Sequence, residues 1–159
     1  MTWTHGDIDG VGIKKLVQHS DVRGWLSELF RSDELPPDLM PAMAYVSVTL
    51  PHTKRGPHEH SVQTDIFCFV GPGHFKIRLW DNRKHSPTYG KMFETVVGEN
   101  NPTLIIVPPG VVHGYVNDSD VPAWVFNCPN RLFAGFKRSE SVDETRHEDS
   151  VSSPFQLDS

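Results

Sequence analysis

Short apolar runs separated by turn-forming residues recur through the middle of the chain. Several alternate polar and apolar positions with a period of two, as residues 74–80 do, which is typical of a strand with one buried face. Glycine, proline or asparagine follows each run, so the runs repeat at roughly 8–12-residue spacing. The predicted strands cover residues 44–50, 66–70, 74–80, 92–97, 104–107, 111–116 and 123–128. This pattern predicts an all-β, antiparallel sandwich or barrel with little helix.

The same alternation indicates which side chains form the core. The predicted core includes Phe67, Phe69, Ile77, Leu79, Ile105, Val107, Val112 and Val125, some of which alternation turns toward a cleft instead. The best helical segment is residues 22–30, but Gly24 and strand-like flanks leave helix and strand both open there.

The length of the chain favours one domain. Its 159 residues include 37% hydrophobic and 22% charged residues, a globular composition with room for a single core. The predicted domain covers residues 1–135. Residues 136–159 are rich in charge and poor in apolar side chains, so we expect an extension that packs on the surface or is partly disordered, with Phe155 and Leu157 able to attach its end.

Charge and hydropathy exclude several classes of function. A net charge of -5 makes nucleic acid an unexpected partner. The longest apolar runs are far shorter than the ~20 residues of a spanning helix, so no membrane segment is expected, and the first twelve residues do not resemble a signal peptide. Two cysteines, Cys68 and Cys128, are too few for a disulfide framework, which favours a cytoplasmic location.

Four side chains with metal-ligand chemistry fall at strand positions. His58 and His60 are two residues apart, so an extended chain projects them to the same side. Asp65 begins the next apolar strand, and His113 follows the Pro-Pro-Gly turn at 108–110. Three imidazoles and a carboxylate suit Fe(II), Mn, Zn or Ni with open positions for substrate. Alternatively, one or more of these histidines are hydrogen-bonded polar residues that line a cleft.

These two stretches resemble the paired motifs of the cupin superfamily. The first motif, H-x-H followed by an acid and a glycine, matches at His58, His60 and Asp65, with Asp65 where many cupins have Glu. The second, P-x-G-x-x-H-x-x-x-N, runs from Pro108 to Asn117. The resemblance implies a cupin-type jelly-roll barrel with the histidines in its mouth.

A narrower resemblance covers residues 8 to 130. Four segments are similar, in order, to the D-x-R-G-x-x-x-E-x-F, R-G-x-H, S-P-T-F-G and P-x-G-x-A-H-G-F segments of dTDP-4-dehydrorhamnose 3,5-epimerases. They are Asp21–Phe30, Arg55–His58, Ser86–Gly90 and Pro109–Tyr115. This resemblance implies an enzyme that epimerises or isomerises a nucleotide-linked 4-keto-6-deoxy sugar, without a cofactor, as a homodimer. Residues 13–30 would be suited to crossing onto the partner.

The resemblance also implies roles for individual residues. His58 occupies the place of the base that removes protons beside the C4 keto group, a task that suits imidazole. Arg23 and Arg55 correspond to arginines that contact the nucleotide's phosphates, which a planar guanidinium does well. Glu28 corresponds to an acid near the nucleotide base, although a solvated glutamate would look the same.

Other positions depart from the family pattern. Asp65 stands where the family has a lysine that steadies the enolate, and an anion there would oppose a developing oxyanion unless a metal ion intervenes. The family's acid is a tyrosine on the strand after H-G-F, and the aligned position is Phe126. The catalytic candidates are therefore His58, His113 and Tyr115, with Tyr89 the other available tyrosine. Asp143 and Asp149 are candidates, by composition alone, for the aspartate that orients the base.

Three hypotheses of function follow. The first is the epimerase or isomerase with His58 as base. The second is a metal-dependent cupin enzyme of other chemistry that uses His58, His60, Asp65 and His113. The third is a non-catalytic module that binds sugar nucleotides, favoured by the missing tyrosine and lysine.

Overall fold

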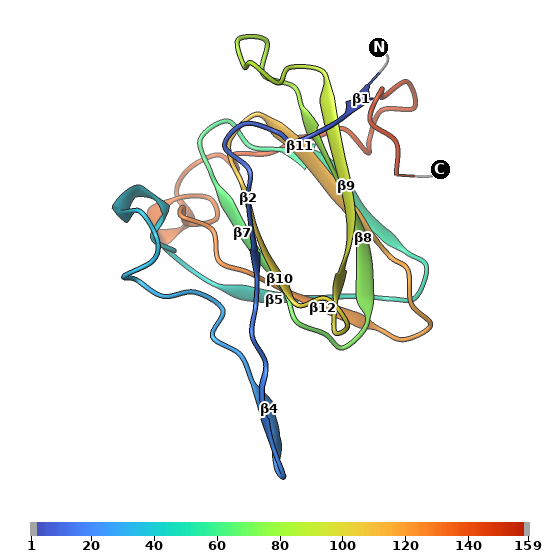
Figure 1. Ribbon diagram of the computed structural model, residues 1–159. Helices are drawn as coiled ribbons and strands as arrows, with labels where there is room; N and C mark the ends of the chain where they lie inside the picture. Colours follow the sequence, from blue (N-terminus) through green and yellow to red (C-terminus); the bar gives the residue numbers. More distant parts are fainter. Residues whose placement is uncertain (1–2, 158–159) are drawn as a thin grey trace.

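The computed structural model describes residues 3–157, and within them nearly all regular structure is β-strand (Figure 1). Residues 1–2 of the predicted domain and residues 158–159 of the predicted extension lie outside the described range. One sheet has six strands in the order β1-β9-β8-β11-β6-β13. Their bounds are Thr4–His5 (β1), Lys91–Gly98 (β9), His74–Asp81 (β8), Val111–Asn117 (β11), Lys54–Glu59 (β6) and Thr145–Arg146 (β13).

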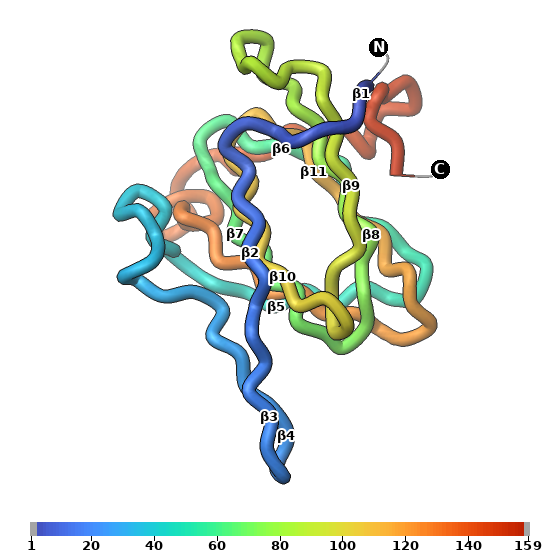
Figure 2. Tube along the Cα trace, viewed as in Figure 1, coloured from blue at the N-terminus to red at the C-terminus, as the bar shows by residue number. Residues whose placement is uncertain are grey.

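A second sheet of five strands faces the first, in the order β2-β10-β7-β12-β5. Its strands are Gly12–Lys15 (β2), Thr103–Val107 (β10), Asp65–Phe69 (β7), Ala123–Asn127 (β12) and Tyr45–Thr49 (β5). Every pairing within the two sheets is antiparallel except the short β1–β9 contact. The two curved sheets enclose the core as a jelly-roll barrel, and the tube in Figure 2 follows the chain around it.

All seven predicted strands are present, each within one residue of its predicted ends. The strands that the pattern did not indicate are polar or short. β6 carries Lys54, Arg55, His58 and Glu59 around a glycine and a proline, so it lacks the apolar alternation of its neighbours. It forms because β11 and β13 supply hydrogen-bonding partners on its two sides.

The ambiguous segment at residues 22–30 is not helical. Its first part belongs to a separate hairpin of β3 (His19–Asp21) and β4 (Gly24–Leu26), which projects away from the barrel (Figures 1 and 2). Within residues 3–157 the helices are two single 3-10 turns, η1 (Pro37–Leu39) and η2 (Phe136–Arg138), and neither has the length to cross a membrane.

The predicted core residues are all buried. Seven of them pack between the sheets with Phe75, Val97, Val111 and other apolar side chains. Val112 instead faces the outer side of the six-stranded sheet, where it packs with Trp80. The chain end covers these two side chains, because Phe155 and Leu157 are buried against them. The charged extension is thereby attached at β13 and again near its end.

Gly56 allows β6 to approach β11 closely. Its φ is +77°, a backbone conformation that residues other than glycine rarely adopt. A Cβ atom at this position would lie 2.7 Å from the backbone oxygen of His113. The close approach coincides with an irregularity in the β6–β11 register, beside the pair His113–His58. The glycine of the R-G-P-H segment therefore places His58 against His113.

Candidate active site

The four predicted ligand residues meet where the two sheets converge. His58 lies on β6 and His113 opposite it on β11, both in the six-stranded sheet. His60 follows the end of β6, and Asp65 begins β7 in the facing sheet. One nitrogen or oxygen atom from each residue lies within 4.8 Å of those of the other three. Spacing along the sequence thus correctly predicted one cluster.

The cluster is centred on the Asp65 carboxylate. Its Oδ2 atom lies 3.0 Å from His60 Nε2 and 3.1 Å from His113 Nε2. Its Oδ1 atom accepts hydrogen bonds from Gln63 Nε2 at 2.9 Å and Asn127 Nδ2 at 2.8 Å. Asp65 and His113 are each 1% exposed, so water does not screen this contact.

Backbone carbonyls fix the tautomers of the two rings. His113 Nδ1 is 3.0 Å from the Val111 oxygen, and His60 Nδ1 contacts the Asp143 oxygen. A carbonyl only accepts, so each Nδ1 carries the proton and a neutral ring turns its Nε2 lone pair toward Asp65. A lone pair and a carboxylate oxygen repel each other unless a proton or a metal ion lies between them.

Two atoms of the contact between Asp65 and His113 have no hydrogen bond. Asp65 Oδ2 and His113 Nε2 are buried and, although close, are not aligned as donor and acceptor, and no other described residue bonds to either. Buried polar atoms without partners are rare and usually indicate an ion, a proton or a function. The imidazole–carboxylate set, with its second nitrogens bonded to backbone carbonyls, fits a divalent metal ion as well as it fits added protons.

Burial and neighbouring charges separate the protonation behaviour of the histidines. Burial, together with the His113 and His60 rings, lowers the pKa of His58 to about 2. Burial also opposes the charged form of His60, but the negative charge of Asp65 at 3.0 Å outweighs it and raises the pKa of His60 to about 9. Although burial opposes its ionisation, the two adjacent rings hold the pKa of Asp65 well below its usual range. At neutral pH, His58 is therefore a neutral base beside a His60 imidazolium.

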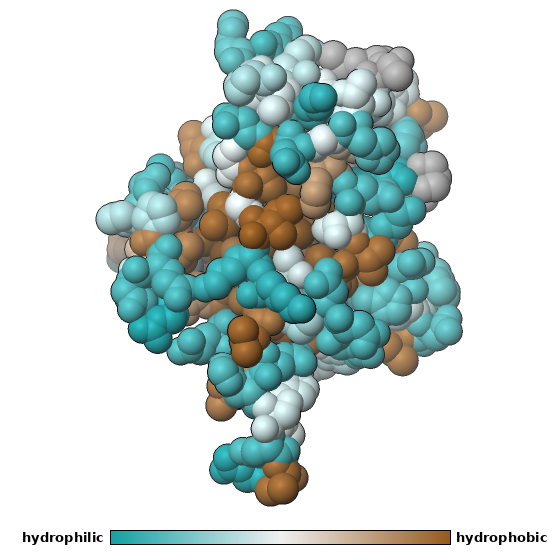
Figure 3. Space-filling model, viewed as in Figure 1, coloured by the Kyte–Doolittle hydropathy of each residue, from teal (hydrophilic) through white to brown (hydrophobic). Residues whose placement is uncertain are grey.

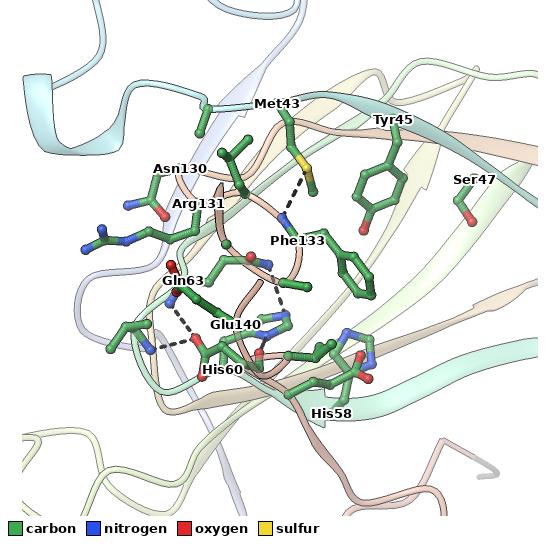
Figure 4. Close-up of a pocket in the computed structure, with 18 of the residues that line it drawn as sticks. Met43, Tyr45, Ser47, His58, His60, Gln63, Asn130, Arg131, Phe133 and Glu140 are labelled. Atoms are coloured by element: carbon green, nitrogen blue, oxygen red, sulfur yellow. Dashed lines mark hydrogen bonds between the residues drawn. The ribbon is translucent and has the colours of Figure 1, made fainter. Parts of the chain in front are cut away.

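A large cavity opens beside the cluster. Its volume is about 1250 Å³, enough for a sugar nucleotide, and His58 and His60 line it together with Tyr45 and Arg55. Figure 4 shows His58 and His60 on one side of this pocket, with Met43 and Tyr45 on the other side in that view. Residues 130–144 close part of the rim and contribute Leu132, Phe133 and Phe136.

Comparison with known proteins decides the family. The sequence profile of the dTDP-4-dehydrorhamnose 3,5-epimerase family matches residues 5–143. The chain belongs to the dTDP-4-dehydrorhamnose 3,5-epimerase family. This confirms the resemblance inferred from the four segments, and the epimerase family agrees with an enzyme rather than a passive binding module.

Relatives and solved structures agree with this assignment. The chain is 41% identical over 110 residues to the spore coat polysaccharide biosynthesis protein SpsL of Bacillus subtilis strain 168, which covers 68% of this chain and 70% of SpsL. It is 35% identical over 128 residues to the probable low-salt glycan biosynthesis epimerase Agl13 of Haloferax volcanii, covering 80% and 81% of the two chains. A dTDP sugar isomerase from Desulfovibrio desulfuricans G20 superimposes with a TM-score of 0.80 at 27% identity, covering 94% and 91%.

Within this epimerase fold, some predicted substrate residues reach the cavity and others do not. Arg55 lines it, with Nε bonded to Thr49 Oγ1 and Nη2 to the Val48 oxygen. Arg23 pairs with Asp21 on the projecting hairpin, and Glu28 pairs with Arg31. Neither lines the cavity of its own chain, because β3 and β4 lead the segment away from the barrel.

The structure also places Tyr115 and Phe126. The Tyr115 ring packs in the core against Phe67, Phe69 and Phe75 and also borders the cavity, and burial raises its pKa to about 12. Phe126 packs against the outer apolar layer of β7 with Cys68, and so does not face the cleft. The inward residue at this point of the epimerase barrel is Asn127, its neighbour on β12.

The two aspartates proposed to orient the base act elsewhere. The Asp143 carboxylate accepts hydrogen bonds from the backbone N–H groups of residues 61, 62 and 63, while its carbonyl holds His60. Asp143 thus orients His60 rather than His58. Asp149 forms an exposed ion pair with Arg146.

Two residues of the site, Tyr45 and Asn127, were not identified from the sequence. Tyr45, Ser47 and Thr49 form a polar series at alternate positions of β5, which indicates a face turned toward a cleft rather than a core. This alternation could have identified Tyr45 from the sequence. The pairing of Tyr45 with Asn127 could not be predicted, since the two residues are 82 positions apart.

Proposed function

We propose that this protein is an epimerase or isomerase that acts on a nucleotide-linked 4-keto-6-deoxy sugar, with His58 as the base. The observation that carries this proposal is an imidazole, in the R-G-x-H position of the family, at the wall of an open cavity. A proton on the carbon beside a ketone is acidic enough for imidazole to remove when the enolate is stabilised. The adjacent His60 imidazolium supplies positive charge in place of the family's lysine.

Arg55 is the proposed contact for the substrate's phosphates. Its Nε and Nη2 atoms bond to β5, which holds the guanidinium in a fixed orientation at the cavity wall. The reaction as proposed needs no cofactor. We place it in the cytoplasm, in line with two buried cysteines that remain free thiols.

The test is solvent exchange. The protein is incubated in D₂O with a dTDP-linked 4-keto-6-deoxyhexose, and NMR follows deuterium at the carbons beside the keto group. Incorporation with inversion supports the epimerase. Binding of the nucleotide sugar without any incorporation would favour the non-catalytic module instead.

We also propose a homodimer, joined through the hairpin of β3 and β4. Val22, Trp25 and Leu26 are exposed there, and Figure 3 shows hydrophobic surface at the tip of the projecting hairpin. Apolar side chains on an extended arm have little to bury against in their own chain, so they favour contact with a second copy. Such a contact would bring Arg23 and Glu28 toward the partner's cavity, which restores their predicted role between subunits.

A double substitution, Trp25→Ser with Leu26→Ser, is expected to convert the dimer to a monomer, because it removes the apolar surface of the arm. Light scattering coupled to gel filtration measures the mass of each species. Tyr89→Ser, on an exposed loop of the barrel, serves as the control and should leave the mass unchanged. A wild-type protein that is already monomeric at micromolar concentration would contradict the proposed dimer.

A second candidate function is favoured by the unpartnered Asp65 Oδ2 and His113 Nε2 atoms. His58, His60, Asp65 and His113 would hold a divalent ion such as Fe, Mn, Zn or Ni, which when bound supplies Lewis-acid chemistry. The protein residues would then bind and orient a substrate at the cavity beside it.

Metal binding predicts coupled losses of metal and stability. A divalent ion at 100 times its dissociation constant would add about 2.7 kcal/mol to the stability of the folded state. His113→Ala should reduce metal content, measured by mass spectrometry, and melting temperature together, and binding should weaken as pH falls because protons compete for the imidazoles. His52→Ala, at an exposed histidine, is the control. An unchanged melting temperature and unchanged exchange in the presence of a chelator would reject the metal.

A further inference from the structure

We propose that Tyr45 is the acid that delivers a proton to the substrate carbon on the face opposite His58. This assignment rests on the proposed epimerase function. Epimerisation inverts a carbon, so the proton must leave from one face and another must arrive at the opposite face. The two residues come from opposite sheets: His58 from β6 of the six-stranded sheet and Tyr45 from β5 of the five-stranded sheet.

Both side chains line the same cavity. Figure 4 shows the Tyr45 ring pointing into the pocket, with its hydroxyl toward the side on which His58 lies. A sugar ring that enters between the two sheets therefore has an imidazole on one side and a phenol on the other.

The hydrogen bonding of Tyr45 leaves its proton available. Asn127 Nδ2 donates to the Tyr45 oxygen at 2.9 Å, and the same amide donates to Asp65 Oδ1 at 2.8 Å. An amide N–H can only donate, so the phenol accepts here and its own O–H is directed elsewhere. Among residues 3–157 no acceptor for that O–H is present. Burial raises the pKa of Tyr45, which keeps the hydroxyl protonated at neutral pH.

The other tyrosines do not fit this position. Tyr115 also borders the cavity, but it is enclosed by phenylalanine rings and is only 4% exposed. Tyr89 lies on the loop between β8 and β9 and does not line the cavity. Of the three tyrosines in the sequence, Tyr45 alone is both part of the cavity wall and well exposed, at 47%.

The step balances in protons and electrons. His58 takes a proton from the carbon beside the keto group, and the electron pair of the broken C–H bond moves to the keto oxygen as an enolate. The enolate carbon then takes the Tyr45 proton on its other face, and the carbonyl forms again. The tyrosinate regains a proton from water while the His58 imidazolium releases one, so no oxidant, reductant or further reactant is consumed.

Tyr45→Phe separates this role from that of His58. The variant keeps the ring, so its melting temperature should match that of the wild type. In D₂O it should still incorporate deuterium beside the keto group, because His58 returns a solvent-derived deuteron to the face from which it took the proton. Inversion at that carbon, measured by NMR of the product, should fall by about 10²- to 10⁴-fold. Tyr89→Phe is the matched control and should leave both measurements unchanged.

The outcomes distinguish the two hypotheses. A folded Tyr45→Phe variant that inverts at a wild-type rate would overturn the role of Tyr45 and leave the epimerase intact. Equal loss of exchange and inversion would also overturn it, because a donor acts after the proton is removed. If the wild-type protein shows no exchange, the epimerase function itself fails, whatever the variant does.

Discussion

Replacing His58 with asparagine is expected to reduce deuterium exchange beside the keto group, and epimerisation with it, by about 10²- to 10⁴-fold. Asparagine has no basic nitrogen, whereas the His58 ring is neutral and faces the cavity. Because exchange needs only removal of the proton and return of a deuteron on the same face, it measures the base directly. Both rates are measured in D₂O with substrate at saturation, so that weaker binding does not imitate a loss of chemistry.

The control is His85→Asn, at an exposed histidine on the loop after β8. It should leave exchange unchanged. Since His58 also belongs to the candidate metal set, the measurement is repeated with wild-type protein in chelator. Exchange that survives chelator but not His58→Asn identifies a metal-free base, whereas undiminished exchange in a folded His58→Asn variant would contradict the proposed base.

Replacing Asp65 with alanine is expected to destabilise the fold by about 3–5 kcal/mol, because it removes one partner of a buried ion pair. The substitution leaves the His60 imidazolium without its counter-charge, and the Gln63 and Asn127 amides without an acceptor. Urea denaturation at pH 7 with chelator present measures the loss. At that pH His60 is charged, since Asp65 raises the pKa of His60 to about 9.

Asp120→Ala provides the comparison. Asp120 also contacts a histidine, His52 at 3.0 Å, but its side chain is 97% exposed. Water already solvates both groups there, so stability should not change measurably. A loss of less than about 1 kcal/mol for Asp65→Ala, below the usual range for a broken buried pair, would show that the cluster does not hold its charges as described.

The predicted strands and core were accurate for a local physical reason. A strand such as residues 74–81 packs every second side chain against the facing sheet. Its sequence therefore alternates between apolar and polar residues. β6 was not predicted because several of its side chains line a cleft instead of packing in the core. Its polar composition reflects the site that it lines, and it pairs only because β11 and β13 lie beside it.

The cluster of three histidines and Asp65 could be predicted in part for a related reason. His58 and His60 are two residues apart on one extended segment, so their common side follows from strand geometry. Asp65 begins the next strand, and family motifs supplied His113. The roles within the cluster could not be predicted, because they depend on which nitrogen of each ring meets the Val111 or Asp143 carbonyl.

The sequence by itself determined a jelly-roll barrel of this epimerase family, with three histidines and an aspartate gathered at its mouth. Only the tertiary structure decided that Asn127, and not Phe126, faces the cleft, and that Tyr45 stands across from His58. It also placed Arg23 and Glu28 outside the cavity of their own chain. Alternation along a strand is a property of near neighbours, whereas these relations join residues that are far apart in sequence, and only the pairing of strands and the facing of two sheets brings such residues together or keeps them apart.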